Sequence, residues 1–413
     1  MIRVFKSGEV ARADILYRGE SGSTQAVEDA VADILADVKK NGDAAVLRYC
    51  EKFDGVKLAG LRVAQADIDA AYEAADPEFI RTLTMAAGNI EAFHKRQIRR
   101  NFVINDTPGV VLGQRYTPVE RVGICVPGSP VAFPSTILMN VIPARIAGVK
   151  EIAVVTPPNQ NGAISAEALA AAKIAGADRV FKIGGAQAVA ALAYGTETVP
   201  QVDKIVGPGG VFVAAAKRKV FGQVDIDMIA GPSEVCVVAD ETADPRLVAI
   251  DLMAQAEHDP LAACYLVTFS DAYADAVEAA IQVHLADSTR ADITRTSLDD
   301  HGLIVVCTSM DQALEAVNVI APEHLEMHVE GAMEYLGAIR NAGAIFLGAW
   351  TPEAVGDYVA GPNHTLPTGG TARYSSPLSV DDFVKKSSII QYSPAALKND
   401  ARAVVQIATH EGL

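Results

Sequence analysis

The segment "EIAVVTPPNQNGAISAEALAAAKIAGADRVFKIG", residues 151–184, decides the fold class of this chain. Two short apolar runs rich in β-branched residues, at 151–156 and 179–184, flank an alanine-rich segment with the spacing of a helix. A strand, a helix and a second strand in this order form a βαβ unit, whose two strands pair in parallel. The segment therefore predicts an α/β protein.

The same alternation continues on both sides of this segment. Strands are predicted at 121–126 and 204–207 and again at 234–240, 263–269, 303–309 and 344–348, and helices at 25–50 and 66–100. We expect an α/β fold with two Rossmann-like domains, each with an incomplete parallel sheet, and small N- and C-terminal extensions. The predicted division is an N-terminal extension (1–24), a first α/β domain (25–126 with 235–377), a second α/β domain (127–234) and a small helical C-terminal segment (378–413).

Composition excludes several classes of protein. The 413 residues are 50% hydrophobic and 21% charged, which is typical of a globular chain. The formal net charge of −16 argues against nucleic acid or an anionic membrane as a partner. No apolar run reaches the length of a membrane span, the N-terminus lacks the apolar core of a signal peptide, and the five cysteines form no CxxC pair. We therefore expect a cytoplasmic protein.

Four glycine-rich turns are predicted at strand ends, where open α/β sheets bind ligands. They are "CVPGSP" (125–130), "IGGAQ" (183–187), "VGPGG" (206–210) and "AGPSE" (230–234), and none is a GxGxxG or Walker motif. Each alone is explained by a tight turn that needs glycine. Four of them within about 110 residues favour at least one ligand crevice.

Polar residues gather in the second half of the chain. Gln255 and His258 are three residues apart, so on a helix they share a face, as they also would on an ordinary surface helix. Asp357 and His364 lie in a long loop rich in Gly, Pro, Ser and Thr at 354–386. Gln255, His258 and Asp357 together could supply nitrogen and oxygen ligands to a divalent ion.

The adjacent pair Glu323–His324 suits proton transfer near neutral pH. The alternative is a helix that begins after Pro322, with the glutamate favoured in its first turn by the helix dipole. From these residues alone the helix start is the preferred interpretation.

Five motifs in order, "GGAQAVAALAYGT", "GPSE", "QAEHDP", "PEHLE" and "GDYVAGPNHTLPTGGTARYSSPLSVDDF", closely resemble the histidinol dehydrogenase family. The resemblance runs from about residue 25 to the C-terminus. It implies a zinc site at Gln255, His258 and Asp357, on the first domain, and an acid–base pair at Glu323 and His324. It also implies a substrate site, whose residues are Ser233, Gln255, His258, His324, Asp357, His364 and Glu411.

The resemblance implies a homodimer in which the C-terminal segment is swapped and a histidine just after "EGL" supplies a fourth zinc ligand. This sequence ends at Leu413, so we expect either a truncated chain, or a site completed by water or by His410, or a weakly held metal. It further implies NAD binding on the second domain at Cys125, Gln187 and Gly210. Cys125 and Gly210 stand where the family usually has Tyr and Asn, and "CVPGS" has Ser129 in place of a glycine.

The implied activity is the NAD-dependent, four-electron oxidation of histidinol to histidine through histidinaldehyde. Two alternatives stay open at the sequence level. One is a related zinc- and NAD-dependent dehydrogenase that acts on another polar alcohol, such as a sulfonated propanediol. The other is a non-catalytic paralogue, which the altered NAD turns and the missing histidine would suit.

Overall fold

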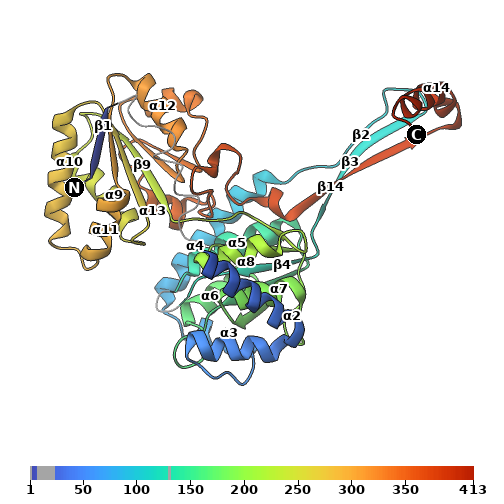
Figure 1. Cartoon of the computed structure of the whole chain (residues 1–413), viewed down its shortest axis with the longest axis horizontal. Helices are drawn as coiled ribbons and strands as arrows, with labels where there is room; N and C mark the ends of the chain where they lie inside the picture. Colours follow the sequence, from blue (N-terminus) through green and yellow to red (C-terminus); the bar gives the residue numbers. More distant parts are fainter. Residues whose placement is uncertain (1, 7–23, 129–131) are drawn as a thin grey trace.

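The structure is a computed structural model that describes residues 2–6, 24–128 and 132–413. It contains two α/β bodies, each built on a parallel sheet, and a narrow arm that projects from them (Figure 1). The predicted fold class, two Rossmann-like domains with terminal extensions, is confirmed.

The first body is built on a six-stranded parallel sheet with the order β1-β11-β10-β9-β12-β13. Two apolar clusters cover its faces, one under the helices α9, α10 and α11 and the other under α12. The strands are β1 (Arg3–Lys6), β9 (Glu234–Ala239), β10 (Ala263–Thr268), β11 (Leu303–Val306), β12 (His324–His328) and β13 (Ala344–Leu347), and the helices α9 (Pro245–Ala256), α10 (Asp271–Leu285), α11 (Ala291–His301) and α12 (Met310–Ile320).

The second body is built on a five-stranded parallel sheet with the order β6-β5-β4-β7-β8. The strand order reverses between β4 and β7, which makes that point the expected place for a ligand crevice. Its strands are β4 (Arg121–Cys125), β5 (Glu151–Thr156), β6 (Arg179–Lys182), β7 (Lys204–Val206) and β8 (Asp225–Ile226), and its own helices α5 (Pro134–Ala147), α6 (Ala166–Ala175), α7 (Gly185–Tyr194) and α8 (Val211–Val220).

The predicted assignment of residues 25–126 to the first body differs from the structure. The helices α2 (Gln25–Asp54), α3 (Gln65–Ala74) and α4 (Pro77–His94) pack on the five-stranded sheet, and β4 is its central strand. Apolar helix faces identify a buried side but not the sheet that buries it, so the sequence did not decide between the two bodies. Of the predicted N-terminal extension, β1 forms an edge of the six-stranded sheet, and residues 7–23 lie outside the described residues.

The predicted helix at 66–100 is two helices, α3 and α4, followed by the short 3-10 helix η2 (Lys95–Gln97). The break falls at Asp76, whose carboxylate accepts the backbone N–H of Glu78, and at Pro77, which occupies the first turn of α4. Proline at this position begins a helix and cannot continue the previous one. In the described ranges, no helix is long and apolar enough to cross a membrane.

The arm is an antiparallel sheet, β14-β3-β2, that carries the C-terminal helix α14 at its tip (Figure 1). Its elements are β2 (Phe102–Ile104), β3 (Val110–Pro118), β14 (Val384–Tyr392) and α14 (Pro394–His410). The C-terminal segment is thus a short 3-10 helix, η6 (Val380–Phe383), a nine-residue strand and one helix, rather than a purely helical piece. Most large apolar side chains of β2 and α14, including Val103 and Val405, are more than half exposed or nearly so, as is Ile390 of β14.

Candidate active site

Strand β12 presents three polar side chains on one face and core residues on the other. His324, Glu326 and His328 alternate with Leu325 and Met327, and the latter two pack in an apolar cluster of the six-stranded sheet. Side chains two apart on a strand point the same way, so one face of β12 is a row of buried titratable groups. The helix predicted after Pro322 is therefore wrong. Pairing with β9 and β13 overrides the helix-start signal.

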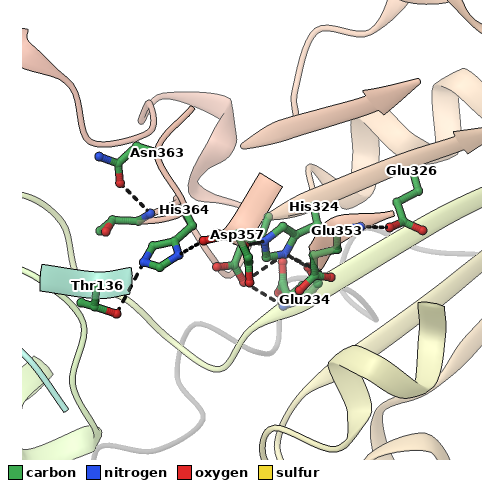
Figure 2. A network of polar contacts seen from close by, with 10 residues as sticks. Thr136, Glu234, His324, Glu326, Glu353, Asp357, Asn363 and His364 are labelled. Atoms are coloured by element: carbon green, nitrogen blue, oxygen red, sulfur yellow. Dashed lines mark hydrogen bonds and ion pairs between the residues drawn. The ribbon is translucent and has the colours of Figure 1, made fainter. Parts of the chain in front are cut away.

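His324 is held in one tautomer by the backbone of β9. Its Nδ1 lies 3.0 Å from the carbonyl oxygen of Glu234, and since a carbonyl only accepts, Nδ1 carries the proton (Figure 2). Within the described residues, Nε2 is buried and has no hydrogen-bond partner. Burial lowers the pKa of His324. The imidazole is therefore a neutral base whose free lone pair is on Nε2.

Glu323 lies beside His324 and is fixed by the same residue of β9. The backbone N–H of Glu234 donates to Oε2 of Glu323 at 2.9 Å, while its carbonyl accepts from His324. Burial raises the pKa of Glu323 well above its ordinary value, although the backbone hydrogen bond opposes this shift. One backbone position therefore orients a carboxyl group and an imidazole for proton transfer near neutral pH.

Two further carboxylates reach His324 from a short helical segment formed by α13 (Glu353–Val355) and the π-helix η4 (Gly356–Ala360). Oδ1 of Asp357 lies 3.8 Å from Nε2 of His324, and Oε2 of Glu353 lies 3.8 Å from its Nδ1 (Figure 2). One ligand atom from each of the three residues lies within 4.8 Å of the others. Burial raises the pKa of Asp357 to about 6 and that of Glu353 to about 8.

Gln255 and His258 differ in their burial and in their secondary structure. Helix α9 ends at Ala256, so Gln255 is its last-turn residue and His258 lies in the following turn, not on the helix as the spacing predicted. Gln255 is buried, and in the orientation that suits its neighbours its amide nitrogen donates to both carboxylate oxygens of Glu353 at 3.2 Å. In the described structure the imidazole of His258 is exposed and forms no hydrogen bond or ion pair. Partial desolvation lowers the pKa of His258, which favours its neutral form.

His364 joins the two bodies at this site. Its Nδ1 donates to the backbone carbonyl of Asp357 at 3.0 Å, so its Nε2 accepts the hydroxyl of Thr136, 3.4 Å away, at the start of α5 (Figure 2). Burial lowers the pKa of His364 to about 4, so it is neutral. A cavity of about 520 Å³ opens at Asp357 and His364 and is otherwise lined mostly by apolar side chains, Phe346 and Leu366 among them.

The electrostatics of this cluster favour a bound cation. Glu323, Glu353 and Asp357 are brought together around neutral His324, and among the described residues no lysine or arginine forms an ion pair with them. A buried carboxylate without a counter-charge costs free energy, and the raised pKa values of these groups are a consequence of that cost. Imidazole nitrogens and carboxylate and amide oxygens are ligand atoms that suit zinc, a divalent cation of intermediate hardness. The residues therefore fit a metal.

The remaining predicted substrate residues are not all at this cluster. Ser233 immediately precedes β9 and is partly buried next to Glu234. Glu411 is exposed at the C-terminal end of α14, at the tip of the arm and away from the six-stranded sheet (Figure 1). His410 belongs to the same helix, where its Nδ1 contacts the carbonyl of Gln406. Within one chain the arm brings neither residue to the cluster.

The predicted NAD-side residues surround the reversal point of the five-stranded sheet. Cys125 ends β4, and Gly207 follows the neighbouring β7 with a φ of 102°; a Cβ on it would lie 2.2 Å from the carbonyl oxygen of Cys125. Gly210 begins α8 and has open space where a side chain would be, and Gln187 is buried in the first turn of α7. Ser129 lies outside the described residues.

Helix N-termini with glycine at this edge offer backbone N–H groups to a phosphate. A hollow of about 720 Å³ lies beyond the carboxyl ends of β4 and β5, at the starts of α5 and α6, and its lining includes Gly128, Thr156 and Pro157 but not Cys125, Gln187 or Gly210. The turn at 230–234 is different. It leads from β8 (Asp225–Ile226) of one sheet into β9 of the other, so the cluster around His324 lies at the amino ends of β9 and β12. This position differs from the carboxyl ends at which open α/β sheets usually bind ligands.

The sequence did not identify Glu234, Glu353 or Thr136 as site residues. Glu353 had a detectable signal, because it lies four residues before Asp357 and the two share a face of any helix. Glu234 acts through its backbone, and Thr136 reaches His364 only across the two bodies. No local pattern marks either of them.

Comparisons with known proteins agree with one another. A family model described as "Histidinol dehydrogenase" matches residues 18–413. A histidinol dehydrogenase of Syntrophotalea carbinolica is 53% identical over 401 residues, which cover 97% of this chain and 93% of the relative. One of Halalkalibacterium halodurans is 50% identical, with 96% and 94% covered. The crystal structure of histidinol dehydrogenase from Elizabethkingia anophelis is 35% identical, has a TM-score of 0.94, and is matched over 100% of this chain and 95% of that one.

Proposed function

Because the chain belongs to the histidinol dehydrogenase family, we propose that it oxidises L-histidinol to L-histidine in two NAD-dependent steps through histidinaldehyde. The chain is an NAD-dependent oxidoreductase of histidine biosynthesis by family. The observation that carries the proposed chemistry is His324, a neutral imidazole of fixed tautomer whose free Nε2 lies in a cluster of buried carboxylates. This geometry suits proton transfer, which favours a catalytic role over a non-catalytic paralogue.

His324 acts as the base of the first step. Its Nε2 accepts the hydroxyl proton of the alcohol while hydride leaves the same carbon for NAD, which gives the aldehyde and NADH. The hydrogen bond from Nδ1 to the Glu234 carbonyl keeps the lone pair on Nε2 and stabilises the imidazolium that forms.

Glu323 acts in the second half of the reaction. Its carboxylate takes a proton from water as the water adds to the aldehyde carbon, and the hydrate then loses a second proton and a second hydride to become the carboxylic acid. Burial raises the pKa of Glu323 well above its ordinary value, which makes its carboxylate a stronger proton acceptor.

Gln255, His258 and Asp357 are the proposed ligands of a zinc ion, through amide oxygen, imidazole nitrogen and carboxylate oxygen. The amide nitrogen of Gln255 donates to Glu353, so its amide oxygen is the atom that can serve as a ligand. When bound, zinc would hold the amine and imidazole of the substrate and stabilise negative charge that develops on its oxygen. Ser233 and His364 are proposed to contact the substrate, since one adjoins Glu234 and the other lines the cavity at Asp357.

NAD is proposed to bind at the reversal point of the five-stranded sheet, against Cys125, Gln187 and Gly210. The exposed backbone of Gly210, with open space where a side chain would be, supports this placement, because an accessible helix N-terminus can bind a pyrophosphate. The NAD edge and the metal cluster belong to different bodies, and the contact of Thr136 with His364 joins them. For hydride to pass from the substrate to NAD, the two bodies must hold the NAD site and the metal site next to each other.

We further propose a homodimer in which the arm of one chain covers the other. The apolar residues of β2, β14 and α14 are exposed to a degree that is unusual for a chain on its own, and only Ala396 is buried in α14. Glu411, distant from the cluster of its own chain, would then reach the substrate site of the second copy.

The test is the stoichiometry of NADH formed per L-histidinol consumed, with and without a zinc chelator. Two NADH per histidinol, lost on chelation and restored by added zinc, is the expected result. One NADH per histidinol would refute the four-electron reaction. Full activity after the zinc has been removed and its absence verified would refute the metal site.

A further inference from the structure

A second cluster of buried titratable groups lies behind the catalytic one, on the same strand. Glu326 and His328 follow His324 on the polar face of β12, and Asp251 of α9 faces them. Nε2 of His328 lies 3.3 Å from Oε2 of Glu326 and 3.5 Å from Oδ2 of Asp251. Asp251 and Gln255 are four residues apart on α9, so one helix face serves both clusters.

Glu326 links this second cluster to the segment that carries Asp357. Its Oε1 accepts the backbone N–H of Glu353 at 2.7 Å, and this contact is drawn in Figure 2. Glu353 is the first residue of α13, and its preceding residue, Pro352, provides no side-chain cap. The first N–H groups of a helix have no partner inside it, so β12 supplies from outside the cap that the sequence of the helix lacks.

The connection fixes two positions relative to each other. His324 and Glu326 are two residues apart on a strand paired on both sides, and Asp357 is four residues beyond Glu353 on one continuous helical segment. A rotation or shift of that segment would change the 3.8 Å separation between Asp357 and Nε2 of His324. Gly356 also lies so close to the ring of Phe346 on β13 that a Cβ would come within 2.5 Å of it. The segment is therefore held by two contacts, the hydrogen bond from the Glu353 N–H to Glu326 and the packing of Gly356 against Phe346.

We propose that Glu326, held by Asp251 and His328, is a positioning residue that sets the place of Asp357 and thereby the strength with which the chain binds zinc. The inference rests on the proposed function, because it takes Asp357 to be a zinc ligand. Residues that orient metal ligands from behind commonly contribute about 10- to 100-fold to metal affinity.

The charges of the second cluster suit this role. Burial lowers the pKa of His328, but the carboxylates of Glu326 and Asp251 beside it outweigh this effect and raise the pKa overall. A protonated His328 pairs with Glu326, which strengthens the carboxylate as an acceptor. Glu326 is fully buried, so without such a partner its charge would be costly.

The experiment compares zinc affinity, measured by competition with a chromogenic chelator, with thermal stability in the full-length protein. Glu326→Gln keeps an oxygen that accepts the Glu353 N–H, whereas Glu326→Met keeps the length of the side chain and has no acceptor. Thr268→Val is the matched control, because it removes a buried hydrogen bond of the same sheet, from Thr268 to the Ala239 carbonyl at 2.9 Å.

We expect Glu326→Met to weaken zinc binding about 10- to 100-fold, Glu326→Gln to bind zinc almost as the wild type does, and Thr268→Val to lower the melting temperature without affecting zinc. His328→Gln, expected to weaken zinc binding several-fold, provides the test if Glu326→Met does not fold. Unchanged zinc affinity in Glu326→Met, or equal losses in Glu326→Gln and Glu326→Met, overturns the inference.

Two other outcomes have separate meanings. A wild-type chain that binds no zinc contradicts the proposed function itself, whatever the variants do. A second zinc per chain that disappears in Glu326→Met would show that the second cluster holds a metal and would overturn its role as a positioning group.

Discussion

Replacing His324 by asparagine tests the catalytic assignment most directly. The amide nitrogen of asparagine stands close to the place of imidazole Nδ1, so it can still donate to the Glu234 carbonyl, 3.0 Å from Nδ1 in the structure. Nothing in the variant replaces Nε2. The substitution therefore removes the base and keeps the hydrogen bond that joins β12 to β9.

The expected loss follows from the role of the removed atom. A positioned general base contributes about 100- to 10,000-fold to the rate, which corresponds to about 3–5 kcal/mol of transition-state free energy. Stability should change little, because the buried carbonyl keeps a donor. In His324→Ala the same carbonyl loses its donor, and a buried polar group without a partner costs about 1–3 kcal/mol.

The assay is NADH formation at saturating histidinol and NAD, with thermal unfolding and zinc content measured on the same preparations. We expect His324→Asn to melt near the wild type and to retain zinc while kcat falls by at least about 100-fold, and His324→Ala to be equally slow but less stable. Turnover of His324→Asn within a few-fold of the wild type would refute the assignment of Nε2 as the base.

Four other predictions concern separate parts of the molecule. Glu323→Gln should slow the aldehyde step more than the alcohol step, seen as release of histidinaldehyde and a yield near one NADH per histidinol; equal slowing of both steps would contradict this. Gly210→Asn restores the residue usual in the family at a position with open space and a φ of −63°, so the KM for NAD should fall, and an unchanged KM would place NAD elsewhere. Burial raises the pKa of Asp251 to about 7, so the folded state retains a proton that the unfolded state loses near pH 4, and the stability contributed by this group is present at low pH and lost as pH rises to about 7. Asp251→Asn should accordingly gain stability relative to the wild type by up to about 1.4 kcal/mol per pH unit in that window in denaturant titrations, and a pH-independent difference would oppose this reasoning. Ile390→Glu places a charge on an exposed apolar side chain of the arm and should shift the protein from dimer to monomer in light scattering, whereas an unchanged mass would exclude this face from the interface.

The sequence by itself determined most strands of both sheets, but not β1, β8 or β12, and it identified several residues that the structure brings together around His324. Apolar runs of strand length, such as 151–156, and the alanine-rich helices between them leave few alternatives to parallel βαβ units, because those runs are buried on both faces. The ordered motifs around Glu323, His324, Asp357 and His364 identified the family, and the structure brings these four residues together.

Only the tertiary structure decided which sheet each helix covers, where a helix signal gives way to a strand, and how the site is charged. Residues 324–328 are a strand because β9 and β13 lie on either side, and α2 to α4 pack on the sheet that follows them in the chain. Glu234 and Glu326 act through contacts with residues 89 and 27 positions away, respectively. Such contacts depend on the order of strands in a sheet. Local periodicity carries no information about that order, because all strands of a parallel sheet have similar, uniformly apolar sequences.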